Sequence, residues 1–292
     1  MRIADATRYA SAQTSMATAA ERQLKATQEA SSGTRINAPS DDPVATAQAL
    51  RVQGALDRTQ GFRSSLQSLR ADAALAESTL GSAGDVMMRA KEIALQGGSG
   101  QLAAGSRAAL ALEVTQMREQ LIALGNTKGN QGYLFGGSKT QAAPFNGGGT
   151  FVGDALDRNA EIGAGVVSAV NTSGAKAFTA AGGRDLLADL AALATALSAD
   201  DAAAVRATVN DLDAGGRQIS AARGDAGLKM AKLETADAAH EQTAMALQVT
   251  QHTLIDVDPA AAYSRLIQAQ QGVESAINVS KTLLDTLRAN RF

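Results

Sequence analysis

Residues 62–94 read FRSSLQSLRADAALAESTLGSAGDVMMRAKEIA. Apolar side chains recur in this stretch at alternating steps of four and three residues, which is the period of a coiled-coil-like helix stripe. The stripe positions are Phe62, Leu66, Leu69, Ala73, Ala76, Leu80, Ala83, Met87, Ala90 and Ala94. This pattern predicts one long helix and makes the fold class mainly α.

Further helical stretches follow this one along the chain. A glycine-rich segment at 97–105 predicts a turn, so the next run should form an antiparallel helix pair with residues 62–94. That run carries Leu110, Val114, Met117, Leu121 and Leu124. After an irregular zone, helical periods return at 186–197, at Val205, Val209 and Leu212, and at 218–254. The result is a long antiparallel helical rod.

The two ends of the chain carry stripes of their own. The C-terminal stripe is Tyr263, Leu266, Gln270, Val273, Ile277, Ser280, Leu284 and Leu287; the weaker N-terminal one is Ile3, Ala6, Ala10, Gln13, Ala17, Ala20, Leu24 and Thr27. Stripes of small residues bury too little surface to offset chain entropy alone. We therefore expect paired terminal helices that need partners, although two ordinary helices docked on their own domain is the alternative.

The middle of the chain has a different pattern. Residues 150–152, 160–162 and 166–170 are short β-type runs bounded by Gly, Asp and Asn, which predict a small β-rich insert. The predicted domains are terminal helical segments at 1–41 and 256–292, a rod at 42–138 and 183–255, and an outer insert at 139–182. The terminal segments are expected to be disordered in the monomer and coiled-coil on assembly.

Two acidic clusters stand directly before prolines. Asp41-Asp42 precedes Pro43, and Asp256-Val257-Asp258 precedes Pro259. Such clusters could bind a divalent cation. A carboxylate just before a helix also accepts hydrogen bonds from the free backbone N–H groups of its first turn, and proline suits that turn. The capping interpretation explains both position and residue type, so we expect no metal site.

Composition excludes several other functions. The chain of 292 residues has no Cys, a net charge of -2 and only 3% aromatic residues. It therefore lacks a basic footprint for nucleic acid and the bulky core typical of a compact enzyme. His240 and His252 are interpreted as surface helix residues, and the sequon Asn171-Thr172-Ser173 is given little weight. No P-loop, nucleophile elbow or acid–base constellation is present, so neither catalysis nor a cofactor is expected.

The sequence also gives little sign of a membrane role. Residues 1–34 lack the apolar region of a cleaved signal peptide, so any export should leave the N-terminus intact. The longest apolar run, 186–199, is interrupted by Asp189 and is too short for a bilayer. We expect no membrane insertion.

Three motifs resemble the bacterial flagellin family. The first comprises Ser32, Gly33, Arg35, Ile36, Asn37, Asp41 and Asp42. Pro43 departs from the filament flagellins, which usually carry small residues there. Tyr133, Leu134, Phe135, Gly136 and Gly137 resemble the hook–filament junction branch of the family, as do residues 256–260.

This resemblance implies a secreted structural subunit of the bacterial flagellum that serves motility by self-assembly. Its implied partners are neighbouring copies in a ring, another hook-associated protein on the hook side, flagellin on the filament side and an export chaperone. Export would follow the flagellar type III route, without a cleaved signal peptide. Two alternatives remain: a filament flagellin, and a secreted helical adhesin or effector that uses the same route.

Overall fold

The computed structural model describes the backbone of residues 2–289 and the side chains of residues 7–286. The helices are α1 (Arg2–Ser32), α2 (Pro43–Gly97), α3 (Ala104–Gly125), α4 (Gly174–Phe178), α5 (Leu186–Ser198), α6 (Ala202–Ile255) and α7 (Pro259–Ala289), with a 3-10 turn η1 at Ala180–Gly182. The strands are β1 (Lys128–Gly129), β2 (Gly132–Tyr133), β3 (Asn159–Gly163) and β4 (Val166–Ala169). The prediction of a mainly α rod with a small β-rich insert and paired terminal helices is confirmed.

Aspartates set several helix starts. Asp42 Oδ1 accepts from Ala45 N at 2.9 Å before α2, and Asp185 Oδ1 accepts from Ala188 N at 3.1 Å before α5. At the start of α6, Asp201 Oδ1 accepts from Ala203 N and Ala204 N, both at 2.9 Å. Each carboxylate satisfies backbone donors that the helix itself leaves free. The capping role predicted for Asp42 is confirmed.

The chain divides into two compact units. Unit 1 comprises residues 1–58 and 244–292, and unit 2 comprises residues 59–243. Both α2 and α6 contribute a segment to each unit. The domains expected from sequence separate helical segments from the β-rich insert, whereas the two units divide the chain by its contacts. The expected domain boundaries therefore stay a prediction.

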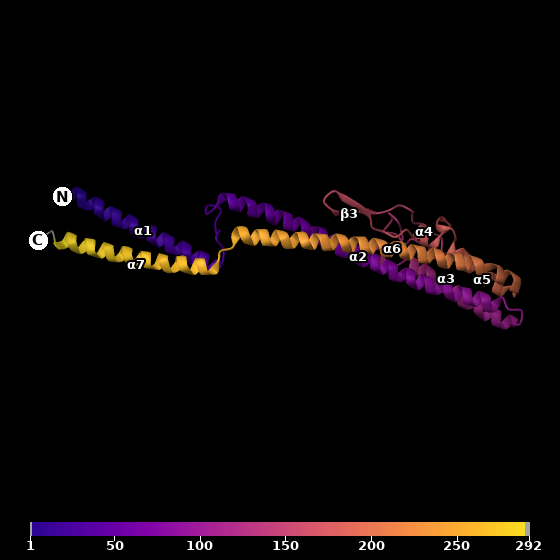
Figure 1. Ribbon diagram of the computed structural model, residues 1–292. Coiled ribbons are helices and arrows are strands. Elements are labelled where there is room, and N and C mark those ends of the chain that lie inside the picture. Colours follow the sequence, from indigo (N-terminus) through magenta and orange to yellow (C-terminus); the bar gives the residue numbers. More distant parts are fainter. Residues whose placement is uncertain (1, 290–292) are drawn as a thin grey trace. The chain divides into compact units, whose positions relative to one another are not determined.

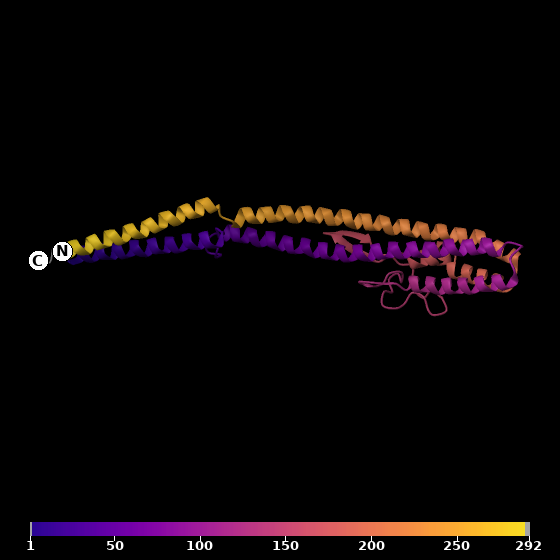
Figure 2. The same ribbon diagram turned by 90° about the horizontal axis from the view of Figure 1, so that it is seen from below.

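Unit 2 has a main apolar core and a second, smaller apolar cluster. The predicted stripe of α2 from Leu66 to Ala94 is buried throughout, and from Ala76 onward it packs with α3, α5 and α6 in the main core. Leu80, Leu121, Leu193 and Val205 are each at most 1% exposed. Figure 2 shows α3 and α5 as the shorter helices of this bundle, and they pack against each other. The helix pair predicted across residues 97–105 is present as α2 and α3.

The β structure consists of two small hairpins. β1 pairs antiparallel with β2 at residues 128–133, before the predicted insert, and β3 pairs antiparallel with β4 within it. The run predicted at 150–152 forms only an isolated bridge, between Phe145 and Phe151. Ile162 and Val170 join Leu66, Leu69 and Leu233 in a second apolar cluster, which fixes the β3–β4 hairpin to α2 and α6.

His240 differs from its expected place on an exposed surface. Its ring stacks on Phe62 with centroids 5.2 Å apart, and Nε2 lies 2.9 Å from the Ile162 carbonyl oxygen. His240 is half-buried because it packs between α6 and β3. This contact joins residues that are distant in sequence, so the sequence did not predict it. His252, by contrast, has a side chain that is 71% exposed, as expected.

Unit 1 has only a thin core. Its α1 and α7 lie side by side in Figures 1 and 2, and they run antiparallel, since Glu29 meets Arg265 whereas Arg8 shares a pocket with Val279. Among its described side chains, six apolar ones are buried, and four of these six are alanines. The six are Ala26, Ala45, Leu56, Ala244, Val257 and Ala262. Burying an alanine removes far less apolar surface than burying a leucine. The pairing of the terminal helices is therefore weakly supported by packing within the chain.

Candidate functional site

The two linkers of unit 1 are joined by a short antiparallel ladder. Arg35 N donates to Ile255 O at 2.7 Å, and Val257 N donates to Gly33 O at 3.0 Å. A bridge between Thr34 and Asp256 lies between these bonds. We call residues 33–37, 41–42 and 254–257 the clasp. It connects the α1–α2 linker to the α6–α7 linker.

Gly33 allows the chain to enter the clasp. Its φ is +71°, a left-handed conformation that glycine adopts without the penalty of a side chain. Ser32 Oγ donates to Gln28 O at 2.7 Å and accepts from Thr34 N at 3.2 Å, which ends α1. The glycine predicted to break this helix therefore does so in the C-terminal position that favours it.

Arg35 joins three parts of the clasp. Its Nη2 donates to Leu254 O at 3.1 Å, at the end of α6, where a cation favours the negative end of the helix dipole. Its Nη1 donates to Asp42 Oδ2 at 3.1 Å, in front of α2. Arg35 thus links the last turn of one helix to the cap of another.

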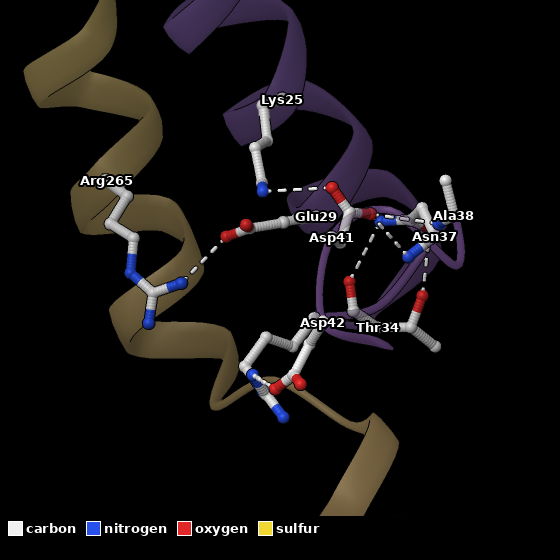
Figure 3. Close-up of polar contacts among 9 residues, drawn as sticks. Lys25, Glu29, Thr34, Asn37, Ala38, Asp41, Asp42 and Arg265 are labelled. Atoms are coloured by element: carbon white, nitrogen blue, oxygen red, sulfur yellow. Dashed lines mark hydrogen bonds and ion pairs between the residues drawn. The ribbon is translucent and has the colours of Figure 1, made fainter. Parts of the chain in front are cut away.

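Asp41 organises the turn between α1 and α2. In Figure 3 its carboxylate faces Lys25, Asn37 and Ala38. Oδ2 accepts from Asn37 N at 3.1 Å and Ala38 N at 2.9 Å, while Lys25 Nζ lies 3.0 Å from Oδ1. Asp41 therefore caps the turn, and of the two acidic residues before Pro43 it is Asp42 that caps α2. Half-buried Ile36 lies in the same turn.

The charges of the clasp shift two carboxyl groups. The hydrogen bond from Lys25, followed by those from Ala38 and Asn37, lowers the pKa of Asp41 below its ordinary value. The backbone hydrogen bond from Ala45, then that of Arg35, likewise lowers the pKa of Asp42. Both groups stay ionised as the pH falls into the range where free carboxyls take up protons.

These shifts predict that acid opens the clasp. A depressed folded pKa contributes stability above the unfolded value, about 3.9 for Asp, and that stability is lost as pH falls through the folded pKa. We expect the amide shifts of Ala38 and Ala45 each to change below about pH 4. NMR titration measures this, with Asp42→Asn as control, which should remove the Ala45 transition alone. Transitions well above pH 4 would contradict the clasp.

An ion pair with a buried carboxylate and a half-exposed guanidinium joins α1 to α7 next to the clasp. Glu29 Oε2 is 2.7 Å from Arg265 Nη1, and the Glu29 side chain is 8% exposed. Figure 3 shows these two side chains extended toward each other from the two helices. The pair fixes the register of α1 on α7, because breaking it would leave a carboxylate buried without its partner.

Asp258 and Asp256 differ in role. Asp258 Oδ1 accepts from Ala260 N at 2.9 Å, before the first turn of α7, so its predicted capping role is confirmed. Asp256 instead lies with Oδ2 2.7 Å from His252 Nδ1. Among residues whose side chains are described, no group of three or more His, Asp or Glu could hold a metal ion.

The motif Tyr133 to Gly137 lies inside unit 2. Phe135 is fully buried, Leu134 is 8% exposed, and Tyr133 lies beside the Lys128 ammonium. Gly136 O accepts from Asp154 N at 3.2 Å, and Gly137, at φ +71°, leaves no room for a Cβ beside Asp154. The structure therefore gives these motif residues a packing role, in which they fix the insert to the rod.

The C-terminal stripe divides between two faces of α7. Leu266 and Val273 are half-buried toward α1, whereas Tyr263, Ile277 and Leu284 are exposed. The Leu287 side chain lies outside the described residues. On α1 the half-buried positions are Ala12, Thr18, Ala19, Gln23 and Ala30. The N-terminal stripe expected from sequence is offset from these by one residue and is exposed wherever its side chains are described.

Sequence reasoning missed two polar anchors of unit 2, the buried Arg107 and the half-buried Gln218. Arg107 donates from Nε to Gly97 O at 2.8 Å and from Nη2 to Ser99 O at 2.7 Å, and it forms an ion pair with Asp200. Gln218 accepts from Arg184 N at 2.8 Å and donates to Ala177 O at 3.1 Å. Gln218 binds backbone groups 34 and 41 positions away, and Arg107 joins the α2–α3 turn to Asp200, 93 positions away. A single sequence carries no signal for such contacts.

Two further expectations from sequence concern the sequon and the membrane. Asn171 of the sequon is 5% exposed, and its amide accepts from Arg158 N and donates to Leu156 O, so it serves as a structural link. The described helices contain no stretch long and apolar enough to cross a membrane.

The chain is similar to known flagellar proteins. Residues 3–140 match the family model of the bacterial flagellin N-terminal helical region. Flagellar hook-associated protein 3 of Salmonella typhimurium is 27% identical over 277 residues, with 87% of each chain covered. The protein of the same name from Escherichia coli has the same identity and coverage.

Two solved structures share the fold. A protein from Vibrio parahaemolyticus described as flagellar hook-associated has a TM-score of 0.68 at 22% identity, covering 74% of this chain and all of that one. The flagellar junction protein FlgL from Legionella pneumophila has a TM-score of 0.58 at 18% identity, covering 72% of this chain and all of that one. The arrangement of helices and insert is therefore a recurrent one.

Proposed function

We propose that this flagellin-like chain is a structural subunit of the bacterial flagellum and forms the junction between hook and filament. The carrying observation is the match to flagellar hook-associated protein 3 over 87% of both chains. That match favours the junction over a filament flagellin, and over a secreted helical adhesin or effector. The motif residues 133–137 and Pro43, which depart from filament flagellins, agree with it.

The proposed mechanism is assembly through unit 1. The α1–α7 pair has few bulky buried side chains, so the free chain gains little by ordering it. Neighbouring subunits would supply the missing apolar contacts, and the terminal segments would order as they enter the polymer. The clasp would then set where each terminal helix begins relative to α2 and α6.

The partners in this proposal follow from the junction position. Copies of the chain form a ring, with another hook-associated protein on the hook side and flagellin on the filament side. A cytoplasmic chaperone escorts the chain to the flagellar type III export channel, through which it passes unfolded and uncleaved. The proposal includes no catalytic step, because the curated relatives are named for a place in the flagellum.

Polymerisation of the purified chain separates the junction from a filament flagellin. A junction subunit must not propagate indefinitely, so we expect monomers or short oligomers by light scattering and electron microscopy. Long helical filaments grown from the purified chain alone would favour the filament flagellin instead.

Leu284→Asp should weaken incorporation into flagella while barely changing the fold. The side chain is 41% exposed, so a carboxylate there stays hydrated in the free chain but would be buried at a subunit contact. Circular dichroism should show a melting temperature close to that of the parent, and immunoblots of sheared flagella should show reduced incorporation. A large loss of melting temperature would place Leu284 in a self-contained core.

A further inference from the structure

The α1–α7 pair of unit 1 has one hollow face. Three pockets lie along the same side of the seam between the helices, and the largest has a volume of about 580 Å³. Its floor is made of small residues, among them Ser15, Ala19, Gly272 and Ala276. We call this side the groove. A Cβ at Gly272 would meet no atom within 4 Å, so the hollow is open at that point.

The opposite side of the same pair is a ridge of bulky side chains. In an antiparallel helix pair, the residues that flank the apolar seam fall on two opposite sides. Residues at equivalent heptad positions of the two helices lie on the same one of these sides. The pocket-lining residues occupy one such side, so Leu24, Tyr263 and Ile277 fall on the other. The exposed side chains of the ridge are Leu24 (63%), Tyr263 (61%), Ile267 (54%), Ile277 (36%) and Leu284 (41%).

Each of the two faces also carries a charge that could pair with one on the other face. Arg22 lines the groove and makes no ion pair among the described side chains, whereas Lys25 and Arg265 beside it are paired. Glu274 lies on the ridge side of α7, also without an ion pair among the described side chains. It stands two residues beyond Gly272, which lines the same pocket as Arg22. Arg22 and Glu274 therefore lie at nearly the same position along the long axis of the α1–α7 pair.

We propose that the ridge of one copy of this chain docks into the groove of the next copy. The inference rests on the proposed function and specifies its contact. Two different complementary faces on one element make a head-to-tail interface, which continues from copy to copy around a ring or helix and does not close as a two-fold dimer. Arg22 of one copy meets Glu274 of its neighbour.

Disulfide trapping tests this contact, because the chain has no native Cys. Ser15→Cys lies in the groove, and Ile277→Cys lies on the ridge beside Ala276, which shares a pocket with Ser15. The two variants are co-expressed in the native bacterium lacking its own copy of the gene, and sheared flagella are oxidised. We expect a cross-linked dimer from the mixture, and neither variant alone should form one.

The outcomes separate this inference from the proposed function. Protein absent from flagella would count against the function itself. Protein present in flagella but linked only ridge to ridge, only groove to groove, or not at all would overturn the groove–ridge contact. Cross-linking only to another flagellar protein would assign the groove to that protein and equally overturn the contact.

Two further sets of variants test the contact without cysteine. Arg22→Glu and Glu274→Arg should each lower incorporation about tenfold, and the double variant should restore it. Gly272→Leu should fill the groove and block incorporation, whereas Gly61→Leu on α2, also with open space around its Cβ, should not. Failure of the charge exchange to restore incorporation, with both single variants folded and impaired, would contradict the pairing.

Discussion

Deletion of residues 263–292 should abolish incorporation into the flagellum and leave unit 2 folded. The deletion removes nearly all of α7, including its half of the Glu29–Arg265 ion pair and of the groove and ridge. Unit 2 draws its core entirely from residues 59–243, so that core loses no side chain. Thermal unfolding followed by circular dichroism should keep a cooperative transition, while immunoblots of sheared flagella should show none of the truncated chain.

Export must be measured in the same experiment. Truncated protein found in the culture medium but missing from flagella shows a failure of assembly, whereas its retention in the cell shows a failure of export. A truncated chain that still connects hook to filament would contradict the role given to α7. Loss of the cooperative transition would show that α7 belongs to a single core with unit 2.

Phe135→Ala should lower the free energy of unfolding of unit 2 by about 3–5 kcal/mol. Four of the six phenylalanines gather here: Phe135 and Phe178 meet edge to face at 5.2 Å, and Phe145 meets both Phe178 and Phe151. The backbone of Gly174 approaches Phe135 so closely that a Cβ there would lie 2.2 Å from its carbonyl oxygen. Because backbone atoms cannot readily move to fill the cavity, we expect the loss in free energy of unfolding to lie in the upper part of this range.

Urea denaturation of the full-length chain measures this loss. Leu112→Ala is the matched control, since Leu112 is 69% exposed and its truncation should change the free energy by less than about 0.5 kcal/mol. Equal, small effects of the two substitutions would show that the motif at 133–137 does not anchor the insert through its aromatic side chain.

The rod could be predicted from sequence because large apolar residues and charged residues occupy clearly different positions of its helical period. Leucines and methionine alternate with charged residues along 62–94, and every stripe position from Leu66 onward is buried. The packing face of α1 could not be predicted in the same way. Alanine occurs on several sides of that helix, so its period does not identify the side that meets α7, and the expected stripe was offset by one residue.

The clasp was only partly predictable. Helix breaking at Gly33 and capping by Asp42 follow from local chemistry. The bond from Arg35 to Leu254 O joins residues 219 positions apart, and nothing in a single sequence relates them. The same limit applies to His240, whose partner Ile162 lies 78 positions away on the insert. Polar contacts between distant segments required the structure.

Labelling of intact flagella tests the central claim most directly. An antibody against the insert of this chain, visualised by electron microscopy on flagella with hooks attached, should mark one spot at the boundary between hook and filament. A filament flagellin would be marked along the whole filament, and an adhesin or effector would be found away from the boundary. Either of those patterns would contradict the assignment of this chain to the junction.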